Sequence, residues 1–111
     1  MNSFKFPVIN PLLHNELRLK VMVILDCLEC ADFMYILKNT ESTKGNLSIQ
    51  LTTLKKAGYV DIAKTGLGCF SHTVCRITDR GREALRAYEK GLRAYFSQDV
   101  SVQAKQSEAA G

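Results

Sequence analysis

The spacing of apolar residues predicts helices through the first half of the chain. Asn10 followed by proline is typical of a helix start, and apolar side chains then recur every three or four positions as far as Leu28. The segments 32–38 and 43–57 show the same helical period. Gly58 stands where glycine commonly ends a helix. We therefore expect three helices in succession.

The second half of the chain changes to the two-residue period of strands and then returns to a helix. Residues 59–65 alternate between apolar and polar side chains, 66–71 contain the two glycines of a turn, and 72–78 return as a second strand. A short extended segment around Cys30 can add a third strand, and Thr78 can cap a final helix. Three helices, a β-hairpin wing and a C-terminal helix make a winged helix-turn-helix, a mainly α fold of the α+β class.

The first and last helices carry more apolar surface than one small domain needs. The first is apolar on two faces, and the last has aromatic residues at its far end. The two helices can pack on each other within one chain. We favour packing between two chains, since unpartnered apolar surface is a liability in a monomer. The expected homodimer interface consists of Leu13, Leu17, Leu19, Met22, Leu85, Tyr88, Leu92, Tyr95 and Phe96.

Length and charge narrow the classes of function. A chain of 111 residues fits one domain, expected over residues 1–96, and the aperiodic Ser, Gln and Ala composition of 97–111 predicts a disordered tail. The net charge is +4, and the segment 38–56 holds four lysines against one acidic residue, which mildly favours a polyanionic partner. No apolar stretch is long enough for a membrane span and no secretory signal is visible, so we expect a cytoplasmic protein.

The helix expected over 43–57 has a leucine face, formed by Leu47, Leu51 and Leu54, and an opposite face suited to a DNA major groove. Small residues allow close approach, asparagine can read an adenine edge, an aliphatic group can meet a thymine methyl, and lysines can hold phosphates. Ile49 on that face is either a contact residue or exposed by chance. The expected base-facing residues are Gly45, Asn46, Ile49, Thr52 and Thr53, with Ser48 beside them; Thr43, Lys44, Lys56, Lys64, His72 and Arg76 are expected near phosphates or in the groove of the wing.

Cysteines are the remaining candidates for chemistry. Cys27 and Cys30 form a C-x-x-C pair, whereas Cys69 and Cys75 are six positions apart in a pattern that no histidine completes as a zinc site. They can act as small apolar residues or as a redox or metal switch, with Cys75 near Cys30 across the sheet. We find no catalytic grouping, so the sequence predicts neither an enzyme nor a bound cofactor or metal.

Three segments carry a family resemblance: "NPLLHNELRLKVMVIL" (10–25), "TKGNLSIQLTTLKKAGYV" (43–60) and "TVCRITDRGREALRAY" (73–88). Over about residues 8–90 the chain resembles the winged-helix DNA-binding domain of small MarR- and ArsR-like transcriptional regulators. The resemblance implies a homodimer held by its terminal helices, binding double-stranded DNA with helix 43–57 in the major groove and hairpin 59–78 as the wing.

The sequence departs from that family pattern at three places. Leucines are usual near Thr40 and Ser42, histidine is common at Gln50, and several lysines or arginines are usual in the wing, which here reads "GLGCFSHT". A wing with so little charge leaves an alternative interpretation, in which the same surface binds a protein and not DNA.

Overall fold

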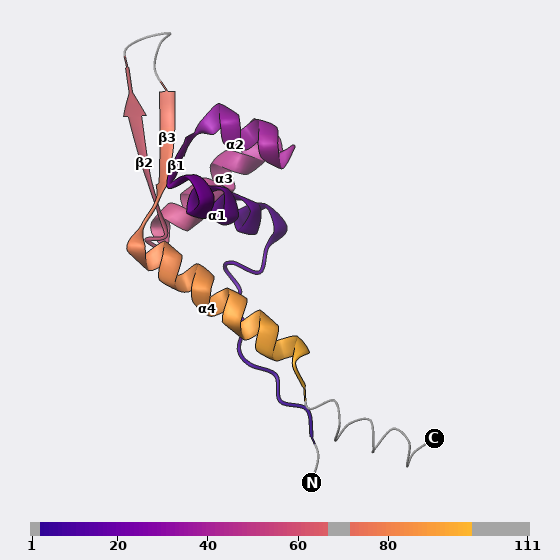
Figure 1. Cartoon of the computed structure of the whole chain (residues 1–111). Helices are drawn as coiled ribbons and strands as arrows, with labels where there is room; N and C mark the ends of the chain where they lie inside the picture. The colour runs from indigo at the N-terminus through magenta and orange to yellow at the C-terminus, as the bar shows by residue number, and fades with distance from the viewer. Residues whose placement is uncertain (1–2, 67–71, 99–111) are drawn as a thin grey trace.

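Over residues 3–66 and 72–98, which the computed structural model describes, the chain forms four helices and a three-stranded antiparallel sheet. The elements are α1 (Glu16–Leu28), β1 (Cys30–Asp32), α2 (Phe33–Thr40), α3 (Lys44–Lys56), β2 (Val60–Thr65), β3 (His72–Ile77) and α4 (Asp79–Phe96). In Figure 1, α1, α2 and α3 lie together beside the sheet, whereas α4 runs away from this body. The predicted winged helix-turn-helix fold is confirmed.

The sheet has the strand order β1-β3-β2, so the expected third strand is present and pairs with β3. Ala31 lies opposite Cys75, and both Cys30 and Asp61 lie opposite Arg76. Successive side chains of a strand point to opposite faces, so Ala31 and Cys75 face the helices. Arg76 and its cross-strand partners Cys30 and Asp61 face outward. Cys30 therefore lies across the sheet one register position from Cys75, as expected, but the two side chains point to opposite faces of the sheet.

The core forms where α1 and α3 meet the inner face of the sheet. Leu47, Leu51 and Leu54 are buried, as their spacing predicts, and they pack with Val21 and Leu25 of α1. Full burial of each such side chain contributes roughly 1.5–3 kcal/mol relative to exposure. Three leucines on one side of α3 therefore fix which side of that helix faces solvent.

The first helix begins later than predicted. Asn10 does not cap it; its side-chain Oδ1 accepts a hydrogen bond from the Leu12 N–H at 2.9 Å, and its carbonyl accepts one from His14 N at 3.0 Å. These two bonds close a local turn, a conformation that asparagine favours. Asn15 is the actual N-cap, accepting from Arg18 N at 2.9 Å.

The turn between α2 and α3 is held by hydrogen bonds of Thr40 and Ser42, at the positions where the family pattern usually has leucines. Helix α2 continues to Thr40, two residues beyond the predicted segment, and the Thr40 side chain is only 5% exposed. Its hydroxyl donates to the Ile36 carbonyl at 2.7 Å and lies 2.8 Å from the Ser42 hydroxyl. Because these hydrogen bonds offset the desolvation cost of the buried hydroxyl, the polar turn is compatible with tight helix packing.

Burial within the chain revises the expected dimer interface. Leu13 and Met22 are 0% exposed, so they are core residues and their prediction as partner contacts is wrong. Leu85 and Tyr88 are also nearly buried, because one apolar side of α4 packs on α1 of its own chain. Most of the apolar residues that recur along α1 are therefore buried or half-buried within their own chain.

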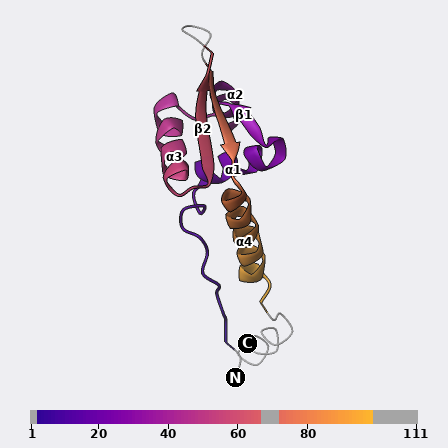
Figure 2. The same cartoon turned by 90° about the vertical axis from the view of Figure 1, so that its left-hand side faces the viewer.

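The N-terminal segment lies along α4, and Figures 1 and 2 both show the two running side by side from the body of the fold. The Gln98 side-chain amide donates to the Lys5 carbonyl at 2.9 Å, and the Phe6 and Tyr95 rings lie 4.8 Å apart. Gln98 was expected to belong to a disordered tail. The rest of that tail, 99–111, and the turn residues 67–71 with Cys69 lie outside the described residues.

Helix α4 starts against the beginning of β2, and glycine is required at that contact. Thr78 caps the helix as predicted, accepting from Gly81 N at 2.9 Å, and its own N–H donates to the Tyr59 carbonyl at 3.0 Å. A Cβ added at Gly81 would overlap that same Tyr59 carbonyl oxygen. None of the helices in the described ranges is long and apolar enough to cross a membrane.

Two glycines of α4 therefore respond in opposite directions to alanine. Gly81→Ala is expected to lower the free energy of unfolding by about 1–3 kcal/mol, because the new methyl group overpacks against Tyr59. Gly91→Ala is the matched control, since its Cβ would meet only the Val8 carbonyl at an ordinary 3.8 Å. It is expected to raise the free energy of unfolding by about 0.5–1 kcal/mol through helix propensity. Urea unfolding followed by circular dichroism measures both; equal effects would contradict the packing described.

Candidate nucleic-acid interface

The outward side of α3 carries nine of the twelve residues that the sequence predicts for DNA contact. Opposite the buried leucines, the helix presents small, polar and basic side chains together with one large aliphatic residue, Ile49, which is 63% exposed. Thr43 caps the helix, its hydroxyl accepting from Asn46 N at 3.2 Å. The exposed or half-buried members of this surface are Thr43, Lys44, Gly45, Asn46, Ser48, Ile49, Thr52, Thr53 and Lys56.

Gly45 is not required by the fold. No other segment of the described chain comes within 4 Å of the position where its Cβ would lie, and its φ is not in the left-handed region. Alanine there would favour the helix by up to about 1 kcal/mol. Gly45 lowers helix stability and makes no internal contact that requires glycine. Because it has no side chain, the helix backbone at this position is open to close contact with a ligand.

A groove runs between α3 and the hairpin. It is a hollow of about 360 Å³ bordered by Ser48 and Thr52 of α3 and by Lys64 and Thr73 of the sheet. Lys64 lies directly opposite Thr73 in the strand register, on the inner face of the sheet but beyond the core. Lys64 therefore lies beside the surface of α3. Thr73 was missed, although the strand alternation already puts it on the same face as Lys64.

The other two basic residues of the hairpin lie on the far side of the sheet. His72 Nδ1 is 3.2 Å from Asp32 Oδ2, and Arg76 Nη1 is 3.4 Å from Glu29 Oε1. The two-residue alternation of β3 puts both side chains on the face away from α3. The structure thus does not bring His72 and Arg76 together with the α3 surface, and it gives each a carboxylate partner.

Asn46 is held by a hydrogen-bonded chain that the sequence analysis did not anticipate. Gln50 Nε2 donates to Asn46 Oδ1 at 3.0 Å, and Gln50 Oε1 accepts from the Arg18 Nη1 group of α1. Arg18 Nε in turn donates to the Leu12 carbonyl at 2.6 Å. The four-residue spacing of Asn46 and Gln50 on one helix is visible in the sequence. The contact between Arg18 and Gln50 could not be predicted, because it depends on how α1 packs on α3.

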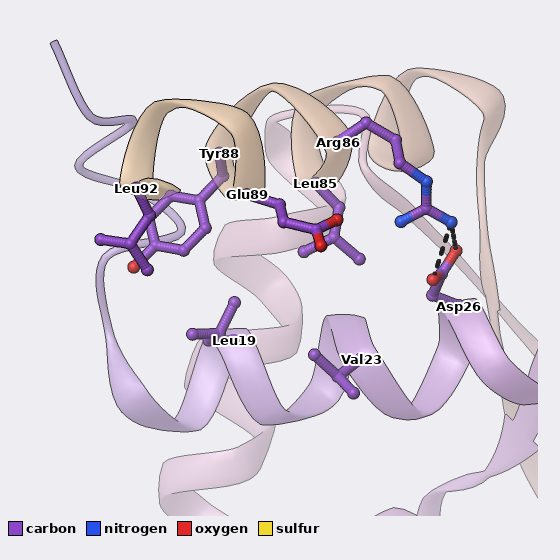
Figure 3. A pocket seen from close by; sticks show the side chains of 8 residues that line it. All are labelled: Leu19, Val23, Asp26, Leu85, Arg86, Tyr88, Glu89 and Leu92. Carbon is purple, nitrogen blue, oxygen red and sulfur yellow. Dashed lines mark hydrogen bonds and ion pairs between the residues drawn. The ribbon is translucent and has the colours of Figure 1, made fainter. Parts of the chain in front are cut away.

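A second surface, which we call the α1–α4 groove, is lined by residues of α1 and α4. Figure 3 shows Leu19 and Val23 of α1 pointing toward α4 across a hollow of about 310 Å³. Val23 is 48% exposed, and an Asp26–Arg86 ion pair with two 2.9 Å contacts lies at one end. Hydrogen bonding to Asp26 raises the pKa of Arg86. The α4 residues that line the groove are Leu85, Arg86, Tyr88, Glu89 and Leu92.

Not all of the predicted interface residues reach this groove. Leu17 is half-buried and lines a separate, more polar hollow with Thr40, Ser42 and Asn46, beside the start of α3. Tyr95 and Phe96 lie farther along α4, where Phe96 is 76% exposed. The apolar surface of α4 therefore continues from the groove to the end of the helix.

The cysteines in the described ranges have different environments. Burial, with a smaller contribution from the Asp32 carboxylate, raises the pKa of the Cys75 thiol to about 11, which keeps it protonated and unreactive at neutral pH. Cys27 is exposed and Cys30 is half-buried. Within residues 3–66 and 72–98, no three histidine, cysteine or acidic side chains are grouped as a metal site.

The family pattern described as "winged helix DNA-binding domain" matches residues 17–96 of the chain. The chain belongs to this winged helix DNA-binding domain family. The match covers α1 through the end of α4 and therefore includes both the α3 surface and the α1–α4 groove. Membership confirms the predicted resemblance to a winged-helix DNA-binding domain.

Solved and curated relatives agree with the family. A transcriptional regulator homologue from Pyrococcus horikoshii OT3 is 32% identical, with a TM-score of 0.72, over 77% of this chain and 84% of that one. An uncharacterised protein of Methanocaldococcus jannaschii is 31% identical over 75 residues, 68% of this winged helix chain and 82% of the relative. A MarR-family transcriptional regulator from Silicibacter pomeroyi shares the fold, at 17% identity and a TM-score of 0.61, over 90% of this chain and 68% of that one.

Proposed function

We propose that this winged helix protein is a homodimeric transcriptional regulator that binds specific sites in double-stranded DNA through α3. The observation that carries the proposal is the two-sided character of that helix. Its leucine side is locked in the core, while its other side offers small, polar and basic groups and the bare backbone at Gly45. A helix of this kind fits a major groove. The similarity to a transcriptional regulator homologue supports the same role.

The proposed contacts divide by chemistry. Asn46, Ile49 and Thr52 face base edges, because their side chains are exposed along the middle of the outward surface. Lys44 near the helix start and Lys64 across the groove hold phosphates on either side, and the N-terminus of α3 favours a phosphate as well. In a dimer the two helices enter successive major grooves, with half-sites about 34–36 Å apart.

A second candidate function rests on the hairpin. His72 and Arg76 face away from α3 and lie beside carboxylates, so they add little attraction for a phosphate backbone on the α3 side. This observation favours a winged helix that binds a protein through α3. The two functions differ in salt dependence, since neutralising several phosphates makes DNA affinity fall steeply with salt.

The terminal elements support the homodimer. The α1–α4 groove leaves Leu19 and Val23 partly uncovered, and the exposed aromatic rings of Phe6 and Phe96 continue this apolar surface along α4. A second copy of the chain supplies an identical apolar ridge for the groove through a two-fold axis. The proposed partner contacts are therefore the uncovered residues Leu19, Val23, Leu92, Tyr95 and Phe96, together with Phe6.

Two substitutions on α3 separate phosphate contact from base reading. Lys44→Ala is expected to weaken binding to all sequences and to reduce the slope of log affinity against log salt by about 0.9, because one counterion-releasing contact is lost. Asn46→Ala is expected to change the preference among sequences, removing about 1–3 kcal/mol of discrimination at one base position. Mobility-shift titrations at two salt concentrations, on sites from in vitro selection, measure both effects.

Lys90→Ala, on the exposed side of α4, is the matched control and should leave affinity and salt slope unchanged. If Lys44→Ala and Asn46→Ala both act uniformly on all sequences, the assignment of α3 to the groove is wrong. If the wild-type protein at about 50 mM salt binds no genomic fragment better than random DNA, the regulator function itself fails.

A charge in the α1–α4 groove tests the dimer. Val23→Glu is expected to raise the dimer dissociation constant at least about tenfold, because a desolvated carboxylate would face an apolar partner surface. Sedimentation equilibrium measures the constant. Ile49→Glu is the control, since it puts the same charge at an exposed aliphatic residue of α3 and should leave the dimer intact while abolishing DNA binding. Unchanged self-association of Val23→Glu would remove this groove from the interface.

A further inference from the structure

The hydrogen bonds around Asn46 form one chain that begins at the N-terminal turn. Arg18 donates through Nε to the Leu12 carbonyl at 2.6 Å and through Nη1 to Gln50 Oε1. Gln50 Nε2 donates to Asn46 Oδ1 at 3.0 Å. Arg18 and Gln50 are half-buried, whereas Asn46 is exposed. The last member of the chain therefore lies on the surface proposed to face DNA.

The direction of every bond in this chain follows from its first member. A guanidinium has only donors, so the Gln50 atom facing Arg18 has to be the amide oxygen. The amide nitrogen of Gln50 then faces Asn46, and an N–H donor requires the Asn46 oxygen opposite it. The remaining group of Asn46, its Nδ2 amino group, is the one free to point outward. An arginine on α1 thus determines which end of the Asn46 amide meets a ligand.

We propose that Gln50 and Arg18 are positioning residues that make Asn46 a hydrogen-bond donor toward DNA, so that it selects the keto bases guanine and thymine over the amino bases adenine and cytosine. At the major-groove edge guanine offers the acceptors N7 and O6 and thymine offers O4, whereas cytosine offers an amino donor and adenine offers one beside its N7 acceptor. The Asn46 oxygen that would accept from an adenine or cytosine amino group is turned toward Gln50. This inference rests on the proposed DNA-binding function and replaces the simpler expectation that Asn46 reads adenine.

The variant Gln50→Glu should reverse the preference. A carboxylate accepts from Arg18 and has no donor for Asn46, so the Asn46 amide rotates to donate to it and turns its oxygen toward the DNA. At the base position read by Asn46, the ratio of guanine and thymine to adenine and cytosine among selected sites should fall by roughly tenfold or more. Overall affinity can also fall through phosphate repulsion, but the ratio at that position is independent of such a uniform loss.

Three controls isolate the chain of bonds. Gln50→Met, which can neither donate nor accept in this way, should relax the preference for guanine and thymine without reversing it. Arg18→Met should do the same, with folding checked by circular dichroism, because Gln50 is then free to turn around. In an Asn46→Ala background, Gln50→Glu should produce no reversal, since Asn46 is the group that contacts the base.

The outcomes separate this inference from the function on which it rests. If the wild-type chain selects no DNA sequence, the proposed function fails and the inference fails with it. If the wild-type chain selects a site but Gln50→Glu keeps the same preference at every position, only the positioning role is overturned. A reversal that persists without Asn46 also overturns it, because the introduced carboxylate would then be reading the base itself.

Discussion

The burial of three leucines on one side of α3 is the constraint on which the rest of the molecule depends. Leu47, Leu51 and Leu54 pack against α1 and the inner face of the sheet, and this contact sets the rotation of α3 about its own axis. Since successive helical residues turn by a fixed angle, fixing the buried side also fixes the exposed side. The composition of the surface proposed to face DNA is therefore decided by packing in the core.

The junction at the end of α3 also determines the position at which α4 begins. Gly58 ends α3 with a φ of 81°, and Tyr59 N donates back to the Leu54 carbonyl at 3.0 Å. Thr78 then donates through its hydroxyl to the Gly58 carbonyl at 2.6 Å, and Gly81 lets the first turn of α4 approach Tyr59. The end of the helix proposed to face DNA and the start of the helix proposed for dimer contact thus share one set of backbone bonds. In the proposed dimer, the spacing of the two α3 helices would depend on this junction.

Much of the fold was readable from the sequence because its signals are local. Leucine spacing, the glycine after α3 and the Thr78 cap each act within a few residues, and all were confirmed. The start of α1 was misassigned because Asn10 and Asn15 are both good caps, and only the turn around Leu12 distinguishes them. The site was only partly predictable. The place of Lys64 followed from strand alternation, but the link from Arg18 to Gln50 joins residues 32 positions apart and needed the packed helices.

The proposed DNA site lies on the α3 side of the sheet, and the outer face, with Asp61 and Arg76, stays free of DNA. Amide chemical-shift mapping by NMR, on adding a selected DNA duplex to the isotope-labelled protein, tests this most directly. We predict that the changes are concentrated on the outward residues of α3 and on Lys64 and Thr73. Changes concentrated on the outer face of the sheet, with α3 unaffected, would contradict the account.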